Sequence, residues 1–296
     1  MRQVKKIAKS LLPDLLLDAV FLARRYKEIH GYYPNLLRPK TFNERILHRN
    51  LFDTSPFLTQ FADKLAVRSY VKDKVGAAPL PQLYWVTSHP SDIPFEKLPA
   101  EFVAKPTHGS GWVRLVSDAS KLDRKDLIST CENWLGQSYY EKTRERIYRK
   151  VVPQILIEEF ISPGSGSVPD DYKLYVFGGE VAMIEIITGR FQAPKSKLFD
   201  KFWQEIDIAF PGFDPVPGAS FERPKRLEEM IAMAEALGGG VDFVRVDLYQ
   251  TEDKVYFGEI TTSPGAGLDR FDPLSFDRDL GMLWGQAASQ GKRRRA

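Results

Sequence analysis

Apolar side chains recur at helical spacing near the start of the chain, while Asp14, Asp18 and Arg25 lie on another side. The apolar positions are Leu12, Leu15, Leu16, Ala19, Leu22, Ala23 and Tyr26. With Pro13 suited to a first turn, this pattern predicts a helix. The helix either packs on the protein's own core or adheres to a membrane surface, and packing is favoured because the basic residues precede the apolar face rather than flank it.

Two further helices are predicted before residue 76. Thr41-Phe42-Asn43-Glu44 has the spacing of a capping box, in which Thr41 and Glu44 bond each other's backbone N–H groups. A third helix is expected from about Asp63 to Lys74, ending at Gly76. Residues 1–75 therefore form a mostly helical region.

Strand patterns begin at Leu83. Residues 101–105 and 113–117 are short β-like runs, and the glycine-rich segment between them predicts a hairpin with a glycine tip. A helical interval over about residues 125–148 comes before another strand, 154–161.

The rest of the chain alternates strands, turns and one helix. Gly178-Gly179 suits a type I′ turn. The expected strands are 172–177, 180–188, 241–250 and 254–261, and the expected helix is 225–237. Because strands and helices do not alternate regularly, this order indicates a mixed α+β fold and disfavours a doubly wound parallel sheet.

Composition excludes several classes of protein. The chain has 296 residues, with 42 Lys and Arg against 39 Asp and Glu, so its charge of +3 does not indicate nucleic-acid binding. One cysteine and four histidines exclude an internal disulfide and a Cys/His zinc cluster, and we expect a cytoplasmic protein. The basic ends, such as the tail 292–295, are either solvated or contact an anionic polymer or membrane.

The last two predicted strands carry a charged face. Arg245 and Asp247 share one side of their strand, whose other side is apolar. A hairpin centred near residue 252 would place Glu259 opposite Arg245 and diagonal to Asp247. The two carboxylates suit Mg²⁺, which takes hard oxygen ligands, although an ordinary cross-strand salt bridge would show the same pattern.

A second set of charges lies earlier in the chain. Lys105 precedes the tip Gly109-Ser110-Gly111, whose backbone N–H groups either form an anion nest or only turn a hairpin. His108 beside it contacts a phosphate or is a loop histidine satisfied by solvent. Lys173, which shares a strand face with Asp171, needs partners near the Glu158-Glu159 strand, and a triphosphate with Mg²⁺ would supply them.

The order of these motifs over about residues 35–285 resembles the ATP-grasp superfamily, and their combination is similar to its TupA-like branch. That branch is associated with the synthesis of bacterial surface polysaccharides and teichuronopeptide. The motifs are Thr41-Phe42-Asn43-Glu44, Ala62-Asp63-Lys64, Ala104 through Gly111, Asp171-Tyr172-Lys173, and Gly258-Glu259-Ile260-Thr261 through Pro264-Gly265. The resemblance implies two sheet-bearing subdomains, about 76–161 and 162–296, that close on ATP after the helical region 1–75.

The resemblance also implies roles for residues at the phosphate end of ATP. Lys64 and Lys105 would touch the α- and β-phosphates, and the loop 109–111 would cover the β/γ region. Arg245 would hold the transferring phosphoryl group.

At the adenosine end, the resemblance implies that Glu158 accepts the adenine amino group. Glu159 and Ile161 would offer backbone groups to the ring, and Asp171 would reach the ribose.

For the metal, the resemblance implies that Asp247 and Glu259 bind Mg²⁺. Thr261 stands where the superfamily usually has an asparagine, and a hydroxyl is a weaker metal ligand than an amide carbonyl.

The implied reaction is carboxylate activation, in which ATP converts a carboxylate into an acyl phosphate that an amine attacks, giving an amide, ADP and phosphate. Lys173 and Arg190 either hold the carboxylate beside the γ-phosphate or are surface charges that flank a hairpin. The expected substrates are small or glycan-linked carboxylates and amines. Two alternatives are a kinase that phosphorylates a glycan hydroxyl and a non-catalytic glycan-binding protein.

Overall fold

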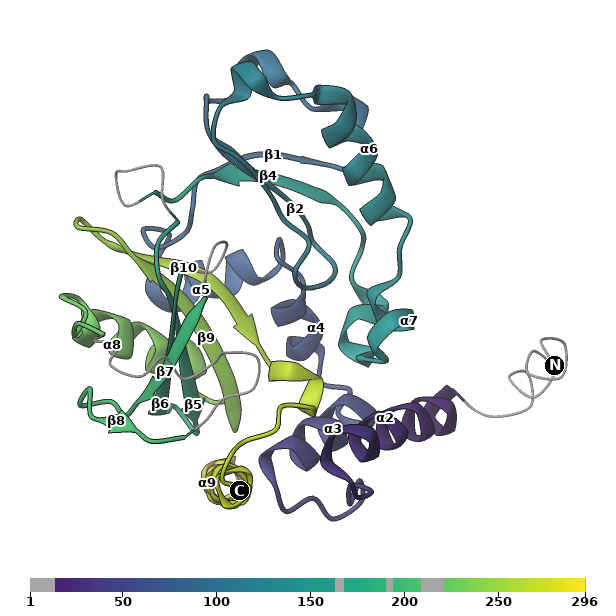
Figure 1. Cartoon of the computed structure of the whole chain (residues 1–296), viewed down its shortest axis with the longest axis vertical. Coiled ribbons are helices and arrows are strands. Elements are labelled where there is room, and N and C mark those ends of the chain that lie inside the picture. Colours follow the sequence, from purple (N-terminus) through teal and green to yellow (C-terminus); the bar gives the residue numbers. More distant parts are fainter. Residues whose placement is uncertain (1–13, 163–167, 190–193, 209–220, 296) are drawn as a thin grey trace, which may run out of the picture.

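The computed structural model describes residues 14–162, 168–189, 194–208 and 221–295, which form two antiparallel sheets with helices around them (Figure 1). The smaller sheet has the order β1-β4-β2-β3. Its strands are β1 (Leu83–Thr87), β2 (Phe102–Pro106), β3 (Arg114–Val116) and β4 (Ile155–Glu159). Helix α6 (Arg124–Leu135) packs on this sheet through Leu127 and Cys131. The predicted hairpin of β2 and β3 is confirmed.

The larger sheet has the order β10-β9-β5-β6-β7-β8. Its strands are β5 (Asp171–Phe177), β6 (Glu180–Thr188), β7 (Lys195–Phe199), β8 (Glu205–Ile206), β9 (Phe243–Gln250) and β10 (Val255–Thr261). Gly178 and Gly179 have φ of 63° and 94°, so the predicted turn between β5 and β6 is confirmed. Strands β7 and β8 were not predicted.

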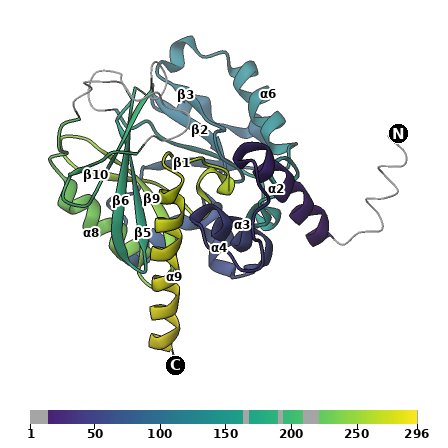
Figure 2. The same cartoon turned by 60° about the horizontal axis from the view of Figure 1, so that its bottom comes forward.

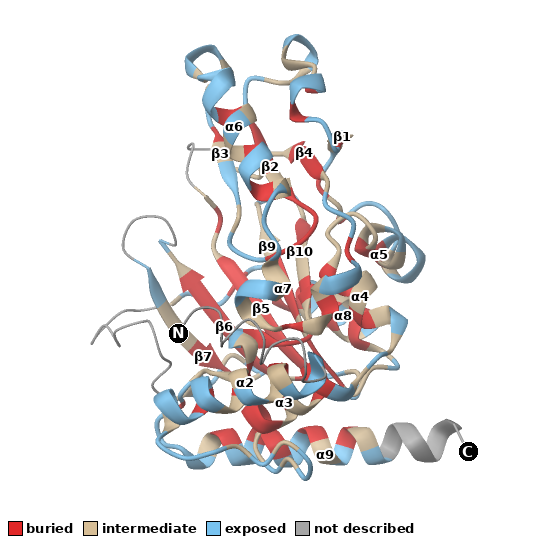
Figure 3. Cartoon of the chain, turned by 90° about the vertical axis from the view of Figure 1, so that its right-hand side faces the viewer, coloured by how far each residue is buried: buried red, intermediate tan, exposed pale blue. Residues whose placement is uncertain are grey.

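Helices cover both faces of the larger sheet, and its strands lie buried between them (Figure 3). Leu174 of β5 packs with α8 (Leu227–Gly238) and α5 (Val67–Val75) on one face. Tyr175, the next residue, packs on the other face with α3 (Phe42–Phe52) and α9 (Ser275–Arg295), which Figure 2 shows running past the sheet. This alternation follows from the two-residue period of a strand. Helices α3 and α5 of the predicted N-terminal region therefore share cores with the larger sheet.

The first described helix, α2 (Asp14–His30), packs on α3. Leu22 and Tyr26 are fully buried there, which confirms packing on the protein's own core, whereas Leu16 is 46% exposed. Asp18, expected on a polar side, is fully buried and bonds Tyr140 at 2.9 Å and Arg146 at 3.0 Å. The helix is thus covered on two sides. Within the described part of the chain, no helix has the length and apolar character needed to cross a membrane.

The capping box is confirmed, and α3 begins at Phe42. The helix expected from Asp63 is wrong at its start, because α4 (Pro56–Ala62) ends there and α5 begins at Val67. Asp63 Oδ1 accepts from the backbone N–H groups of Leu65 and Ala66, which turns the chain at Lys64. The end of α5 at Gly76 agrees with the prediction.

The helical interval over residues 125–148 is broken into three pieces. After α6 come α7 (Tyr139–Thr143) and the 3₁₀ helix η4 (Arg146–Lys150). Other 3₁₀ turns are η1 (Pro90–Asp92), η2 (Phe95–Lys97), η3 (Ala119–Lys121) and η5 (Pro264–Gly267). The break brings η4 into contact with α3, α4 and α7.

The register of the β9–β10 hairpin differs from the predicted one. A bulge between Phe257 and Glu259 pairs Glu259 with Asp247 and Thr261 with Arg245. Gly258 forms this bulge, since a Cβ there would lie 2.9 Å from the Asp247 carbonyl oxygen. After the bulge, successive side chains point to the opposite face from the one that strict alternation predicts. The core side chains are Val255, Phe257 and Ile260, whereas Glu259 and Thr261 point into the cavity.

Candidate active site

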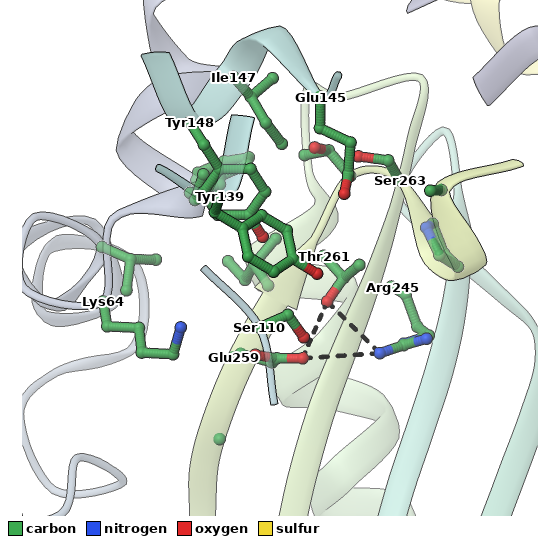
Figure 4. Close-up of a pocket in the computed structure, with 18 of the residues that line it drawn as sticks. Lys64, Ser110, Tyr139, Glu145, Ile147, Tyr148, Arg245, Glu259, Thr261 and Ser263 are labelled. Atoms are coloured by element: carbon green, nitrogen blue, oxygen red, sulfur yellow. Dashed lines mark hydrogen bonds and ion pairs between the residues drawn. The ribbon is translucent and has the colours of Figure 1, made fainter. Parts of the chain in front are cut away.

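A cavity of about 460 Å³ lies between the smaller sheet, the edge of the larger sheet and the helices α4 and α7 (Figure 4). A smaller cavity of about 150 Å³ adjoins it. The two share Lys64, Lys105, Ser110, Glu158 and Glu259. Together they have the size of a small-molecule binding site.

Of the predicted site residues, twelve line one or both cavities: Lys64, Lys105, Ser110, Gly111, Glu158, Glu159, Ile161, Lys173, Arg245, Asp247, Glu259 and Thr261. His108, Gly109 and Asp171 do not line them. Arg190 lies outside the described residues.

One wall of the larger cavity carries three cationic side chains. Lys64, at the turn between α4 and α5, donates to the carbonyl oxygen of Gly109, and burial lowers its pKa. Lys105 forms an ion pair with Glu158, and an Arg68 nitrogen lies 3.7 Å from the same carboxylate. This wall can bind an anionic ligand.

The glycine-rich loop between β2 and β3 packs closely against α7. Gly109 has φ of 119°, and a Cβ there would lie 2.9 Å from the Tyr139 ring. His108 is 3% exposed, and its Nε2 lies 3.1 Å from the carbonyl oxygens of both Trp134 and Gln137. Its ring is buried and joins the loop to the end of α6. The interpretation as a loop histidine satisfied by solvent was therefore wrong, and contact with a phosphate stays a prediction.

Asp247 sits between two cationic side chains. Its carboxylate accepts two hydrogen bonds from Arg245, each of 2.7 Å, and one of 2.8 Å from Lys173. Lys173 also donates to Asp171 at 2.7 Å. Burial alone would raise the pKa of Asp247, but Arg245 and Lys173 lower it to about 2. The cluster fixes the Arg245 guanidinium at the cavity.

The carboxylate that suits a metal is Glu259. Its side chain is 34% exposed and accepts from the Thr261 hydroxyl at 3.2 Å, with an Arg245 nitrogen 3.6 Å away. Asp247, its neighbour across the strands, is 1% exposed, and both of its oxygens already accept from Arg245 and Lys173. Among the described residues, no group of three His, Cys, Asp or Glu could hold a metal ion. The exposed carboxylate of Glu259 suits Mg²⁺, which takes one or two carboxylates together with phosphate oxygens, and the metal roles of Asp247, Glu259 and Thr261 stay predictions.

The residues expected at adenine lie along the smaller cavity. The backbone N–H of Glu159 donates to Gln82 at 2.8 Å, and its carboxylate accepts from Tyr256 at 3.0 Å. Asp171 is 1% exposed beside Lys173. The roles of Glu158, Glu159, Ile161 and Asp171 toward adenosine stay predictions.

The sequence interpretation missed several residues of the cavity, among them Arg68, Tyr139, Glu145 and Tyr148. Three of them come from the broken helical interval. The signal of the break was Ser138 three residues before Glu141, since the Ser138 hydroxyl caps α7 by accepting from the Glu141 N–H.

Several solved structures share a partial likeness with this chain. D-alanine-D-alanine ligase from Bacillus anthracis, complexed with ATP, has a TM-score of 0.46 at 16% identity, over 81% of this chain and 69% of that one. The ATP-grasp ligase PsnB, complexed with a minimal precursor, has a TM-score of 0.39 at 17% identity, over 71% of this chain and 55% of that one. L-amino acid ligase from Bacillus licheniformis has a TM-score of 0.41 at 20% identity, over 72% of this chain and 44% of that one. This chain thus spans little more than half the length of PsnB and under half of the L-amino acid ligase.

No curated protein matches the chain in sequence. The sequence model described as TupA-like ATPgrasp, in contrast, matches residues 44–284, which contain both sheets and every described element that lines the cavity except α2. The chain therefore belongs to the TupA-like ATP-grasp family.

Proposed function

We propose that the protein is an ATP- and Mg²⁺-dependent ligase that joins a carboxylate to an amine through an acyl phosphate. The observation that carries this proposal is the cavity itself. Its cationic wall of Lys64, Lys105 and Arg68 faces the strands that bear Arg245 and Glu259. Lys105 and Arg68 share the single carboxylate of Glu158, so a bound polyphosphate would add anionic partners for this wall.

The chain's own residues would act by charge and position. Lys64 and Lys105 bind phosphate oxygens, and the N–H groups of the loop 109–111 add donors. Arg245 stabilises the negative charge that develops on the transferring phosphoryl group. Its guanidinium needs no rearrangement for this, because Asp247 already holds it by two hydrogen bonds.

Glu259 would hold Mg²⁺, which, when bound, neutralises charge on the phosphate oxygens. Thr261 orients this carboxylate through its hydroxyl. Lys173, expected to hold the carboxylate substrate, is 7% exposed and bonded to two aspartates. We therefore assign Lys173 to positioning Asp247 and Arg245.

We further propose that the protein acts in the cytoplasm on a surface-polysaccharide or teichuronopeptide precursor. This proposal rests on what the TupA-like branch is associated with. Peripheral contact with a membrane, through the basic termini and the exposed Leu16 side of α2, belongs to the same proposal.

The test is a coupled assay for ADP with ATP, Mg²⁺ and a panel of uronic acids and amino acids as carboxylates. Hydroxylamine is added to intercept the acyl phosphate. We expect ADP and a hydroxamate to appear together with one of the carboxylates. A stable phosphorylated glycan without hydroxamate or free phosphate would contradict the ligase and support the kinase.

A further inference from the structure

One acidic side chain of the cavity is used by none of the steps above. Glu145 lies between α7 and η4, lines the larger cavity and is only 5% exposed. In Figure 4 it lies apart from Lys64, beside Ser263. The cavity thus carries cations on one side and this carboxylate on another.

Within the described part of the chain, no Lys or Arg forms an ion pair with Glu145. Its neighbours are the hydroxyl groups of Ser263 and Thr143, which are neutral donors. Burial raises the pKa of Glu145 to about 7. A buried carboxylate with only neutral donors is costly, so a ligand that brings a positive charge would be stabilised there.

Two aromatic rings stand beside this carboxylate. Tyr139 and Tyr148 both line the cavity, and their ring centroids are 4.7 Å apart. Burial, and after it electrostatic interaction with Glu145, raises the pKa of both phenols. The faces of aromatic rings attract cations such as ammonium groups. A carboxylate together with two rings is a suitable environment for a primary ammonium group.

The other charged groups that line the cavity do not neutralise Glu145, so a cationic ligand can do so. Arg245 is neutralised by Asp247, and Glu259 adds a second negative charge near Tyr148. Arg25 of α2 also lines the cavity but forms no ion pair with Glu145 in the structure as described. An anionic acceptor would meet the unpaired carboxylate and would be disfavoured.

We propose that Glu145, Tyr139 and Tyr148 form the site that binds the positively charged amine of the acceptor substrate. The assignment rests on the proposed ligase function, since a kinase that acts on a neutral hydroxyl needs no such charge. It names the acceptor's chemical class, a primary amine that is protonated in solution.

The test uses n-butylammonium chloride as the probe and n-butanol as its neutral isostere. Thermal shifts are measured for the full chain at constant ionic strength, each relative to the same variant without probe. We expect n-butylammonium to stabilise the wild type more than n-butanol does. Glu145→Gln should lose at least three quarters of this difference, while Glu141→Gln, an exposed change on α7, should keep it.

Tyr148→Leu is the second variant and should lose about half of the difference through its missing ring. Equal shifts with the two probes in the wild type, or a full difference in Glu145→Gln, would overturn the site. The shift with ATP and Mg²⁺ is recorded in parallel. Its absence from the wild type would contradict the proposed ligase, whereas the amine site is judged by the probe pair alone.

Discussion

At the scale of single residues, the two carboxylates expected to share a metal have different environments. Asp247 is buried against Arg245 and Lys173, whereas Glu259 is 34% exposed in the cavity. Removal of one partner from a buried ion-pair cluster leaves the other charges unpaired, and this is expensive. The two carboxylates should therefore differ in what they contribute to stability.

We expect Asp247→Asn to lower the free energy of unfolding by about 3 to 5 kcal/mol, because two buried cations lose their partner. Glu259→Gln should lower it by less than about 1 kcal/mol, since its charge is partly solvated. Urea unfolding followed by circular dichroism measures both values. Equal small effects of the two variants would contradict the assignment of Asp247 to positioning.

The raised pKa of Glu145 predicts a dependence of stability on pH. Its pKa of about 7 in the folded protein exceeds the ordinary 4.5, so the folded state binds the proton more tightly. The associated stability is present below about pH 4.5 and is lost as pH rises through 7. Glu145→Gln stays neutral, and at about pH 8.5 it should be more stable than the wild type by up to about 3 kcal/mol.

Near pH 5 the wild type and Glu145→Gln should unfold at similar temperatures. Glu185, whose pKa burial also raises to about 7, stays in both proteins and cancels from the comparison. If the two proteins differed in unfolding temperature by the same amount at both pH values, Glu145 would be ionised at both, and the raised pKa would be contradicted.

At the scale of elements, the sequence predicted well those features that depend on local pattern. The two-residue alternation in β9 correctly placed Val244 and Val246 in the core and Arg245 and Asp247 on the other face. It failed in β10, because the bulge at Gly258 shifts the alternation by one residue, and the isolated glycine that could have indicated the bulge was not used. Such a bulge depends on a close backbone approach, which only the folded sheet defines.

Gly258→Ala tests the role of the bulge. The new Cβ would lie 2.8 Å from the Tyr249 ring and 2.9 Å from the Asp247 carbonyl, and neither the backbone nor the packed ring can yield easily. We expect a loss of about 1 to 3 kcal/mol in unfolding free energy and a smaller thermal shift with ATP and Mg²⁺.

The matched control is Gly136→Ala at the end of α6. The nearest atoms to its added Cβ lie at 3.6 and 3.7 Å, which is ordinary contact. This variant should unfold close to the wild type. If Gly258→Ala behaved in the same way, the bulge would not be what orients Glu259.

The break in the helix after α6 is a second feature that the local sequence pattern did not predict. Composition over residues 125–148 favours helix throughout, and the chain does form helical turns there. Their separation depends on contacts remote in sequence, such as Tyr140 with the buried Asp18. The amine site proposed here lies in that separated part and so could not be predicted from periodicity.

At the scale of the whole molecule, two sheets were predictable, but the packing of the N-terminal helices on the larger sheet was not. Phe42 and Ile46 of α3 pack in one core of the larger sheet, and Val67 and Val71 of α5 pack in the other. The boundary near residue 75 remains a prediction about domains. The packing shows that both cores need side chains from before it.

We therefore expect a chain that begins at residue 76 to lose cooperative unfolding, because each apolar face of the larger sheet would lose part of its cover, α5 on one side and α3 on the other. Thermal unfolding followed by near-ultraviolet circular dichroism, with the full chain as the control, measures this. A sharp transition in the shortened chain would show that residues 76–296 fold by themselves.

The central claim is that the cavity between the two sheets binds ATP through its cationic wall. Isothermal titration of ATP with Mg²⁺ into the wild type, Lys105→Met and Lys121→Met tests it most directly. Lys105 lines the cavity, whereas Lys121 lies in η3 with its side chain 84% exposed. We expect saturable binding that Lys105→Met weakens at least tenfold and Lys121→Met leaves unchanged. Absence of binding to the wild type, or equal affinity of all three proteins, would contradict the account.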